Sequence, residues 1–553
     1  MSEVISEVIG IDFGTSTSLI YHSGPGARMV PVPIGYAHSW MSSVVGSNGR
    51  LLLVGEDAEL LAGNQVIRSI KSAIGTGSKT IAINDGANDI LLEVDDVITA
   101  LLKEVATRAG DQVIDVATPG AVRLGCPAMW DGPQRQRLIR SAARAGIAVG
   151  DNTLVDEPIA AGVAWIVHRT ERKNQNVRGK LLVFDMGGGT LDLAVLDVSA
   201  SSGDVPEIHV QSATGIGRAG DALDNEIVSD LRRQLEEAGI DVDRLPRQGA
   251  LGDALLRAAR EIKVELTTTQ DVAVAASTYV DAHIPVLHYT REALEIAFRP
   301  QLEQAEELVW AVLRAARTTY AESYTPWDVR RQTTAQLAAE IDYVLLAGGM
   351  SRVPAVANHL SRMFPLAEIH LEAGVDPQEL VAAGLSETIG YDRLNLHRPG
   401  FDFVLEWGDG NGGPVSRETL YNAYTPFYEP WEAMSRNRID YQWRSPAGLL
   451  PRRGQGILRV VSVQDGPINM AVDGTEAPGL AVAFGHGEVV LTLATNGRVW
   501  IRDGLGNVQA LRVEKWPVLR GRDHAILRAR NLEATNQRAR LLKELPWHQQ
   551  PYD

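Results

Sequence analysis

The sequence predicts an α/β fold that contains an internal duplication, followed by a small domain rich in β-strands. Two glycine-containing turns indicate the duplication, since each follows an apolar strand that ends on an acid, at Asp12 and at Asp185. A third glycine turn, Gly348–Pro354, lies between a buried-type strand and a helix, as in ligand-binding crevices of α/β proteins. After about residue 390 the chain holds short apolar runs separated by turns, which is typical of antiparallel β domains.

Length and composition are those of a globular protein with several domains. The chain has 553 residues, of which 45% are apolar and 22% are charged. The net charge of −16 argues against nucleic acid as the main partner, because contacts to phosphates need a basic surface. The single cysteine, Cys126, excludes an intrachain disulfide. The N-terminus lacks the features of a secretory signal, and no apolar run approaches the roughly 20 residues that span a bilayer. We therefore expect a cytoplasmic protein without a membrane partner.

Before residue 180, the apolar pattern alternates between short strands and helices. The strand Val8–Phe13 leads into the turn DFGTSTS at Asp12–Ser18, and the apolar stretch Leu19–Tyr21 follows. Small residues in DEPIAAGVAW, at Asp156–Trp165, permit this expected helix to pack closely against another helix. The other expected strands are Val30–Pro33, Ser43–Val45, Gln112–Thr118, Val122–Cys126 and Thr153–Val155, and the other expected helices begin in VGEDA and cover Asp95–Arg108 and Leu138–Ala145.

The second glycine turn lies in Leu181–Val198, whose sequence LLVFDMGGGTLDLAVLDV predicts a strand, a tight turn and a second strand. The run Gly187–Gly189 lets the backbone turn sharply and approach a ligand. Asp185 and Asp192 flank this turn. Backbone N–H groups can face an anion while carboxylates face the water shell of a metal ion. We therefore interpret this segment as a turn that holds a phosphate and its Mg²⁺.

The rest of the chain is expected to add further strands and helices, and then the β-rich domain. The basic tail Arg520–Lys543 is interpreted as a solvated helix, and the tryptophans after residue 400 either pack in a core or form an apolar recognition surface. Expected strands are Ile208–Ala213, Val272–Ala276, His283–His288, Ile341–Ala347, Ile457–Val463, Asn469–Val472, Leu480–Phe484, Glu488–Leu493, Val499–Ile501 and Leu511–Val513, and expected helices are one in AGDALDNEIVSDL, Ala250–Leu266, Arg291–Ala316 (as one helix or a pair), one reaching Leu360, and Asp376–Ile389.

Taken in order, several segments resemble the nucleotide-binding domain of the 70-kDa heat-shock (DnaK-like) chaperones. They are DFGTSTS, VGEDA, RSIKSAIGTG, PAMWDGPQRQ, DEPIAAGVAW, FDMGGGTLD, AGDALD and LLAGGMSRVP. The resemblance covers roughly residues 8–390 and implies the actin-like ATPase fold, with ATP or ADP and Mg²⁺ held between two lobes. It assigns residues 1–390 to a nucleotide-binding domain. The short apolar runs after it are expected to form a β-rich C-terminal domain, residues 391–553, that binds a protein client or partner.

The resemblance also implies a role for individual residues. Those of the first phosphate loop are Gly14, Thr15 and Ser16, and those of the second are Gly187, Gly188, Gly189 and Thr190. Asp12 and Asp185 are expected to hold Mg²⁺ through water. The catalytic groups around the γ-phosphate and its attacking water are Lys71, Glu157, Thr190 and Asp192. The remaining nucleotide-binding residues are Asp221, Lys263, Thr267, Gly348, Gly349 and Arg352. Pro127 and Arg135 match the pair that relays the nucleotide state in this family.

The chain also departs from the family pattern. AGDALD loses one glycine of the usual GGEDFD, and Arg260 stands where an acid contacts adenosine in the family. The segment after Ile389 lacks the usual acidic and leucine-rich linker, and no match to the family's peptide-binding domain and helical lid follows it. The sequence therefore supports the ATPase more strongly than it supports a general chaperone.

These features bear on four candidate functions. The preferred hypothesis is a slowly hydrolysing, ATP-driven chaperone or client-handling switch, assisted by a co-chaperone or exchange factor. The alternative is a nucleotide-gated scaffold or regulator with one dedicated protein partner. The ordered motifs and the appended β domain argue against an actin-like filament. The segment PAMW argues against a small-molecule kinase, in which Asp192 would be the base.

Overall fold

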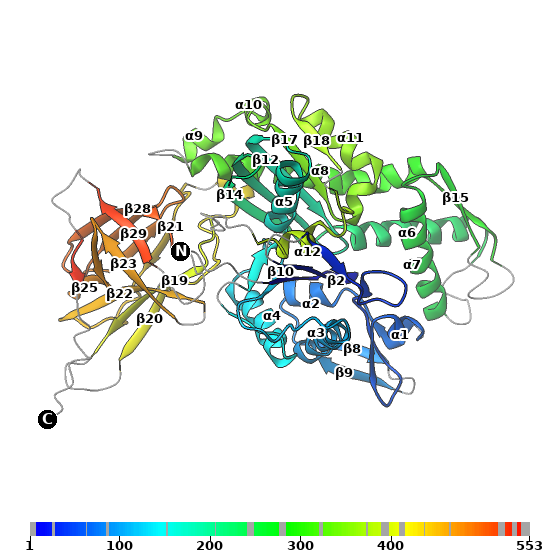
Figure 1. Ribbon diagram of the computed structural model, residues 1–553, viewed down its shortest axis with the longest axis horizontal. Coiled ribbons are helices and arrows are strands. Elements are labelled where there is room, and N and C mark those ends of the chain that lie inside the picture. The colour runs from blue at the N-terminus through cyan, green and yellow to red at the C-terminus, as the bar shows by residue number, and fades with distance from the viewer. Residues whose placement is uncertain are drawn as a thin grey trace.

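The computed structural model shows two α/β lobes and a β-rich C-terminal unit. In Figure 1 this unit lies on the left, and the two lobes lie on the right, one above the other. No described helix is long and apolar enough to cross a bilayer. The structure describes residues 7–24, 28–61, 63–84, 88–150, 153–204, 206–240, 248–275, 284–319, 325–371, 374–388, 397–408, 415–435, 437–463, 466–517, 526–532 and 539–542.

The first lobe is built on a mixed sheet. Its central strand β1 (Val8–Phe13) forms a hairpin with β2 (Thr17–Ser23), which pairs in turn with β3 (Val30–Val32). On its other side β1 runs parallel to β10 (Val122–Cys126), and β10 runs parallel to β11 (Leu154–Asp156). The first glycine turn therefore connects the two central antiparallel strands.

The second lobe repeats this plan. Its central strand β12 (Val177–Met186) forms a hairpin with β13 (Leu191–Ala200), which pairs with β14 (Glu207–Ile216). On its other side β12 runs parallel to β17 (Tyr343–Ala347), followed by β18 (Glu368–His370). Each glycine turn thus occupies the same hairpin of its sheet, which confirms the predicted duplication.

The remaining elements of the two lobes surround these sheets. The helices are α1 (Glu56–Glu59), α2 (Ile70–Gly75), α3 (Val94–Asp111), α4 (Gly132–Arg144), α5 (Glu157–Val167), α6 (Gly220–Glu237), α7 (Gln248–Glu265), α8 (Arg291–Thr318), α9 (Pro326–Arg330), α10 (Thr334–Ala338), α11 (Pro354–Met363) and α12 (Leu380–Leu385), with short 3₁₀ or π segments at Gly63–Gln65, His168–Arg172 and Gly349–Arg352. The smaller strands are β4 (Met41–Ser42), β5 (Val45–Ser47), β6 (Leu52–Val54), β7 (Val66–Ile67), β8 (Thr80–Asn84), β9 (Asp89–Glu93), β15 (Asp271–Val274) and β16 (Leu287–Thr290).

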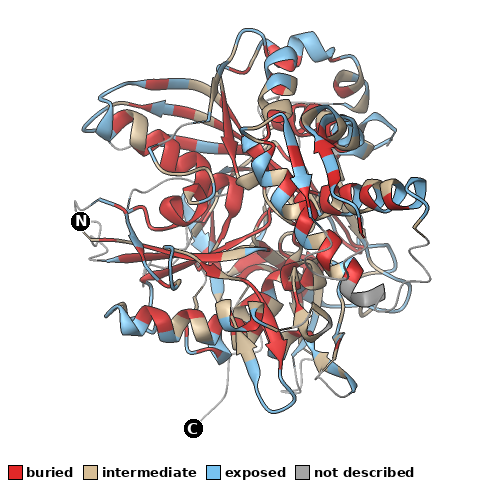
Figure 2. Cartoon of the chain, turned by 90° about the vertical axis from the view of Figure 1, so that its right-hand side faces the viewer, coloured by how far each residue is buried: buried red, intermediate tan, exposed pale blue. Residues whose placement is uncertain are grey.

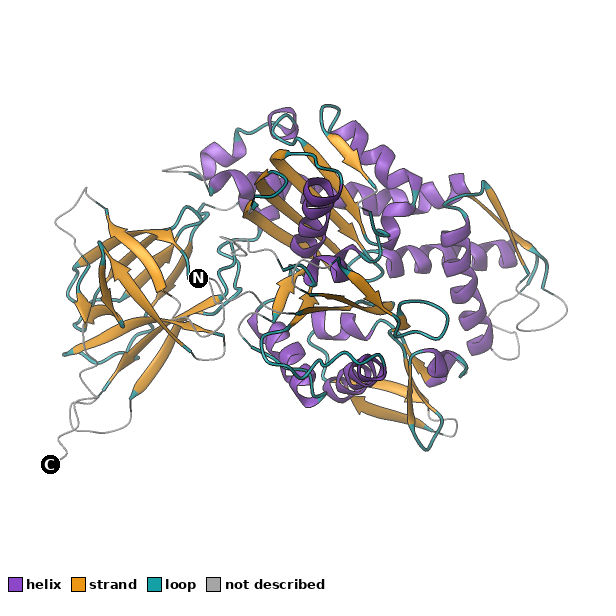
Figure 3. Ribbon diagram, viewed as in Figure 1, coloured by secondary structure: helices purple, strands orange, loops and turns teal. Residues whose placement is uncertain are grey.

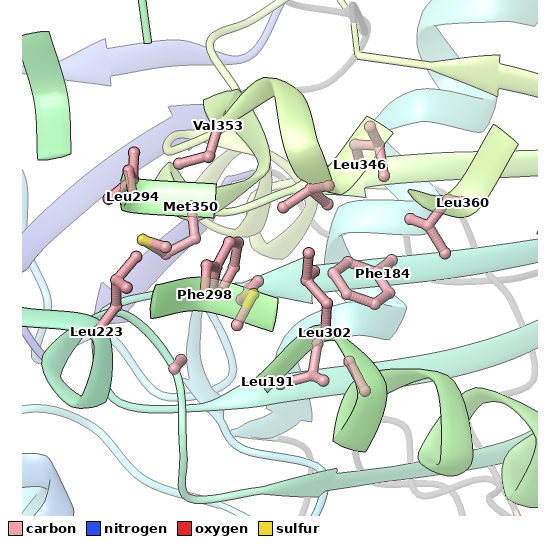
Figure 4. Close-up of a cluster of buried hydrophobic side chains, with 14 of the residues drawn as sticks. Phe184, Leu191, Leu223, Leu294, Phe298, Leu302, Leu346, Met350, Val353 and Leu360 are labelled. Atoms are coloured by element: carbon pink, nitrogen blue, oxygen red, sulfur yellow. The ribbon is translucent and has the colours of Figure 1, made fainter. Parts of the chain in front are cut away.

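The core of the second lobe lies between its sheet and helix α8. Figure 4 shows Phe184 of β12 and Leu346 of β17 on the sheet side of this core, with Phe298 and Leu302 of α8 in the same cluster. Buried residues follow the strands and the inward faces of the helices, whereas the outer helix faces are exposed (Figure 2). Because such interiors are close-packed, this layer fixes the strand ends that carry the site residues.

Helices α5 and α12 pack against each other where the two lobes meet, and their small residues bring the two backbones into contact. A Cβ on Gly384 of α12 would lie 1.8 Å from the carbonyl oxygen of Ala160 in α5. The close helix packing expected from the small residues of α5 is therefore present.

The substitution Gly384→Ala is expected to destabilise the protein, because the added methyl group overlaps the backbone of α5. We expect a loss of about 1–3 kcal/mol, measured by thermal or denaturant unfolding. The matched control is Gly110→Ala in helix α3, where nothing lies within 4 Å of the new Cβ. This control should leave stability unchanged or raise it by about 0.5–1 kcal/mol. Equal stability of the two variants would contradict the close contact.

The C-terminal unit is one connected set of strands, in agreement with the predicted β-rich domain (Figure 3). It contains β19 (Phe401–Trp407), β20 (Ser416–Tyr421), β21 (Tyr441–Arg444), β22 (Gln455–Ser462), β23 (Pro467–Val472), β24 (Thr475–Ala477), β25 (Gly479–Ala483), β26 (Val490–Leu493), β27 (Arg498–Arg502), β28 (Val508–Lys515), β29 (Ile526–Asn531) and β30 (Leu541–Leu542), with a 3₁₀ helix at Pro430–Met434. Residues 389–396 lie outside the described residues, so the domain boundary at 390 stays a prediction.

Two predicted elements are wrong. The expected strand Gln112–Thr118 is a series of turns after α3, in which Val113 has a positive φ of 64° and is 92% exposed. The described parts of the expected tail helix are strands β29 and β30. In β29 the buried residues Leu527 and Ala529 alternate with arginines, and this period of two is a strand pattern that basic composition obscured.

Three further expectations need smaller corrections. The strand expected at His283–His288 is β16, a few residues later. Of the strand expected at Ser43–Val45, only Val45 lies in a strand, β5, and Ser43 and Val44 separate β5 from β4. The expected last helix Asp376–Ile389 shortens to α12. Arg291–Ala316 is a single helix, α8, that accommodates Pro300.

Candidate nucleotide site

The two predicted phosphate loops, one from each lobe, face each other. A Cβ on Gly188 would lie 2.6 Å from Oγ of Ser16, and a Cβ on Gly189 would lie 2.6 Å from Oγ1 of Thr15. Only glycine permits this approach of a backbone to the opposite loop. The structure therefore brings the backbone N–H groups and hydroxyls of both loops to the same place between the lobes. Thr190, the last residue of the second loop, contributes a side-chain hydrogen bond to Asp192.

Three buried aspartates lie at the strand ends beside these loops. Asp12 is on β1, and Asp185 and Asp192 are cross-strand partners on β12 and β13. Burial, and then the charge of Glu157, raises the pKa of both Asp12 and Asp192 to about 7. The same two causes, with the neighbouring aspartates, raise the pKa of Asp185 well above its usual range. Crowded carboxylates of this kind favour a bound cation.

Among the described residues, no three His, Cys, Asp or Glu side chains are grouped so as to ligate a metal directly. This donor set fits Mg²⁺, which keeps most of its waters and binds through one or two carboxylates and the phosphates of its substrate. Asp12 and Asp185 therefore suit the predicted role of holding the ion through water.

Lys71 supplies a buried positive charge in this acidic site. It lies on α2, is 2% exposed, and forms an ion pair and a hydrogen bond with Glu157 at the start of α5. Burial opposes the lysine charge, but the charges of Glu157 and Asp12 hold the pKa of Lys71 above its usual value. The structure thus joins α2 of the first lobe, α5 and the strand ends in one charged cluster.

The comparison with known families agrees with this arrangement. The family profile described as Hsp70 protein matches residues 8–389. The chain belongs to the Hsp70 protein family. Its first part therefore has the actin-like ATPase fold, with two duplicated lobes.

Curated relatives with this match are proteins named "Chaperone protein DnaK". The chain is 27% identical over 387 residues to the protein of Mycoplasmoides gallisepticum, covering 68% of this chain and 58% of the relative. It is 26% identical over 392 residues to that of Thermosipho melanesiensis (69% and 59%) and to that of Ureaplasma urealyticum serovar 10 (68% and 57%). The chain thus spans a little under three fifths of the relatives that it matches.

The residues predicted for the nucleoside side differ in how close they lie to the phosphate loops. Asp221 lies at the phosphate loops, since its N–H donates to the carbonyl oxygen of Gly188 (2.7 Å) and its carboxylate accepts from Ser69 of the first lobe. Lys263 lies nearby, but its Nζ is 2.6 Å from Oδ1 of Asp224 and donates to the carbonyl oxygen of Gly220. The lysine is therefore engaged with α6 in this structure.

The backbone of Gly348 packs directly against Asp185. It has a φ of 76°, and a Cβ there would lie 2.5 Å from Oδ1 of Asp185. A Cβ on the adjacent Gly349 would lie 2.8 Å from the side-chain amide nitrogen of Gln378. Both glycines are therefore required for close contacts around the end of β17.

Two predicted residues make other contacts. Arg352 forms an ion pair with Asp376. The hydroxyl of Thr267 donates to the carbonyl oxygen of Val264 at the end of α7, and no described contact joins it to the phosphate loops. Their adenosine roles stay predictions.

Two further site residues, Ser69 and Ser72, were not predicted from the sequence and stand on either side of Lys71. Ser69 has a positive φ of 55°, and its hydroxyl donates to Asp221 across the lobes. Oγ of Ser72 is 3.1 Å from the position of a Cβ on Gly189. The sequence signal was the segment RSIKS itself, in which hydroxyl residues flank the predicted catalytic lysine.

The loop before α4, PAMWDG, holds one of the predicted catalytic acids. The N–H of Ala128 donates to Oδ1 of Asp192 (2.7 Å). The carbonyl of the same peptide group, that of Pro127, accepts from Nη2 of Arg135 (3.4 Å). Arg135 is 2% exposed and is held by Asp156 at 2.7 Å. The two residues that match the family's relay pair thus act on the peptide that orients Asp192.

The C-terminal unit contacts this same loop. Nη1 of Arg398 donates to the carbonyl oxygen of Ala128, and the ring of Tyr424 lies 4.1 Å from Cζ of Arg135. Arg398 is 7% exposed, and burial together with the charge of Arg135 lowers its pKa. His397 adds a hydrogen bond from Nε2 to the carbonyl oxygen of Ala315 in α8 (2.7 Å). The β-rich unit is therefore in direct contact with the PAMWDG loop of the candidate site.

Proposed function

We propose that this chain is an ATP-binding, slowly hydrolysing chaperone-type switch, whose β-rich C-terminal unit handles a protein client. The observation that supports it most strongly is the buried cluster of Asp12, Lys71, Glu157, Asp185 and Asp192 beside two facing glycine loops. The proposal includes Mg²⁺ as cofactor, a cytoplasmic location, and a co-chaperone or exchange factor as a further partner.

The residues suit phosphoryl transfer to water. This reaction needs charge neutralisation, an oriented water molecule and exclusion of solvent, rather than a covalent intermediate. Lys71 offsets charge on the γ-phosphate, and Thr15 and Thr190 donate hydrogen bonds to phosphate oxygens. Mg²⁺, when bound, neutralises the phosphate oxygens. Asp192 is the better candidate to orient the water, since Glu157 is already paired with Lys71.

The C-terminal unit supports a second candidate function. Its described residues form strands and a short 3₁₀ helix, and none forms an α-helical lid. This observation favours a nucleotide-gated scaffold that serves one dedicated protein partner.

Removing Mg²⁺ with a chelator is expected to lower ATP turnover to background, because the buried acids and phosphates would then lack a counter-charge. Phosphate release by the purified full chain measures this, and added Mg²⁺ should restore it. The variant Asp12→Asn should need a higher Mg²⁺ concentration for half-maximal turnover. The exposed control Asp96→Asn should behave as wild type. Full turnover without divalent cations would contradict the proposed site.

Denatured model proteins distinguish the two candidate functions. A client-handling chaperone should bind them and hydrolyse ATP faster in their presence. If they neither bind nor raise turnover, the dedicated-partner function is favoured. Affinity purification with the Asp192→Asn protein, with and without ATP, followed by mass spectrometry, would then identify that partner by its nucleotide dependence.

A further inference from the structure

Helix α2 carries Lys71 as its second residue, and the residue just before the helix, Ser69, has an unusual backbone conformation. Its φ of 55° and ψ of 35° lie in the left-handed region, which residues with a Cβ rarely adopt. A serine in this position usually accepts a hydrogen bond from the first turn of its own helix, but the described contacts of the Ser69 side chain include no such bond. Its hydroxyl is used across the lobes instead.

The hydroxyl of Ser69 donates to the carboxylate of Asp221, which lies at the start of α6 in the second lobe. Asp221 is in turn fixed to the second phosphate loop, because its N–H donates to the carbonyl oxygen of Gly188 (2.7 Å). The N–H of the neighbouring Gly220 donates to the carbonyl oxygen of Gly187 (3.2 Å). One side-chain hydrogen bond therefore connects the phosphate loop of the second lobe with helix α2 of the first lobe.

Two carboxylates from different elements thus hold the lysine segment. Glu157 pairs with the ammonium group of Lys71, whereas Asp221 holds the turn at which α2 begins. The helix also lies close to the loop one turn later, since Oγ of Ser72 is 3.1 Å from the position of a Cβ on Gly189. The ion pair fixes the charged end of Lys71, and the bond to Asp221 fixes where its helix begins relative to the loop.

The conformation of Ser69 has a free-energy cost that this hydrogen bond helps to offset. Strained backbone of this kind persists where the surrounding contacts hold it, and it is found most often at functional sites. Glycine would adopt the same φ without strain. The local fold therefore does not call for a serine here, and the feature that serine adds over glycine is the hydroxyl that reaches Asp221.

We propose that Ser69 is a positioning residue for ATP hydrolysis. By donating to Asp221 across the lobes, its hydroxyl sets the distance between Lys71 and the second phosphate loop, and so places the ammonium group at the γ-phosphate. Positioning of this kind acts on kcat, because a small displacement of a charged group weakens its interaction with the transition state. The inference rests on the proposed function, since it assigns a further residue to the same reaction.

The variant Ser69→Gly removes the hydroxyl and suits the left-handed backbone. We expect the kcat of the full chain to fall about tenfold, while the KM for ATP changes by less than about twofold. The unfolding temperature should stay equal or rise, because glycine relieves the strain at this position. Steady-state phosphate release and thermal unfolding measure the two effects on the same preparation.

A second variant at this position, Ser69→Asn, tests for rescue. Asparagine tolerates the left-handed region, and its side-chain amide can donate to Asp221, so this variant should recover part of kcat. The matched control is Ser78→Ala, just beyond the other end of α2, where the hydroxyl contacts Thr76. This control should hydrolyse ATP at the wild-type rate.

A double-mutant cycle tests the partner of Ser69. In the Asp221→Ala background, the further change Ser69→Gly should lower kcat by less than about twofold, because the hydrogen bond is already absent. The proposal is overturned if Ser69→Gly leaves kcat unchanged or raises only KM, if Ser69→Asn recovers none of the lost kcat, or if Ser69→Gly lowers kcat as much in the Asp221→Ala background as in wild type. If wild type hydrolyses ATP and only these comparisons fail, the proposed function stands. If wild type does not hydrolyse ATP, both proposals fail.

Discussion

Replacing Lys71 by methionine is expected to lower the kcat for ATP hydrolysis by about 100-fold or more. The lysine carries a buried positive charge beside Glu157 and the three aspartates, and it is the group placed to offset charge on the γ-phosphate. Methionine keeps the length of the side chain, so packing around α2 changes little. Single-turnover phosphate release and nucleotide binding measure the effect, and ATP should still bind, since the glycine loops remain.

The exposed lysine Lys103 on α3 supplies the control. Lys103→Met should hydrolyse ATP at the wild-type rate. A Lys71→Met protein that is folded by circular dichroism and retains normal turnover would show that the assigned catalytic cluster is wrong.

Replacing Arg398 by methionine is expected to lower kcat about tenfold while the KM for ATP changes little. No described contact joins Arg398 to either phosphate loop, but it donates to the carbonyl oxygen of Ala128, whose N–H holds Asp192. Without this clamp the PAMWDG loop is free to shift, and the acid proposed to orient the water loses its fixed position. Steady-state kinetics of the full chain measure the split between kcat and KM.

Conservative rescue distinguishes this role from a general loss of stability. Arg398→Lys keeps a donor and a charge, so it should recover part of kcat, whereas the exposed control Arg452→Met should not change it. If Arg398→Met leaves kcat unchanged, the contact between the C-terminal unit and the loop has no influence on hydrolysis. Burial and the nearby charge of Arg135 disfavour a charged Arg398. The role expected here, holding the PAMWDG loop that positions Asp192, gives a reason for its presence.

The predictions from sequence succeeded where the signal is local. A strand that ends on an acid and continues into a glycine turn has few alternative conformations, so the hairpins at Asp12 and Asp185 were recognisable from short segments. Helix α3 was also predicted from a local signal, because its apolar residues recur at helical spacing. The errors occurred where spacing was ambiguous, as in Gln112–Thr118, or where composition was trusted above period, as in β29.

The candidate site required contacts that no local pattern encodes. As an isolated residue Lys71 would be assigned to the surface, yet the fold buries it against Glu157, which lies 86 positions later. The ion pairs of Lys263 with Asp224 and of Arg352 with Asp376 were also not predictable, because they depend on which segments of the chain meet in the fold.

The sequence by itself determined the duplicated α/β fold, the two phosphate loops, their acids and the β-rich character of the C-terminal residues. Periodicity and turn chemistry encode these features within a few residues of each other. Only the tertiary structure decided that Ala128 lies between Asp192 and Arg398. This arrangement arises from the packing of the C-terminal unit against the PAMWDG loop, which brings together residues that are distant in the chain.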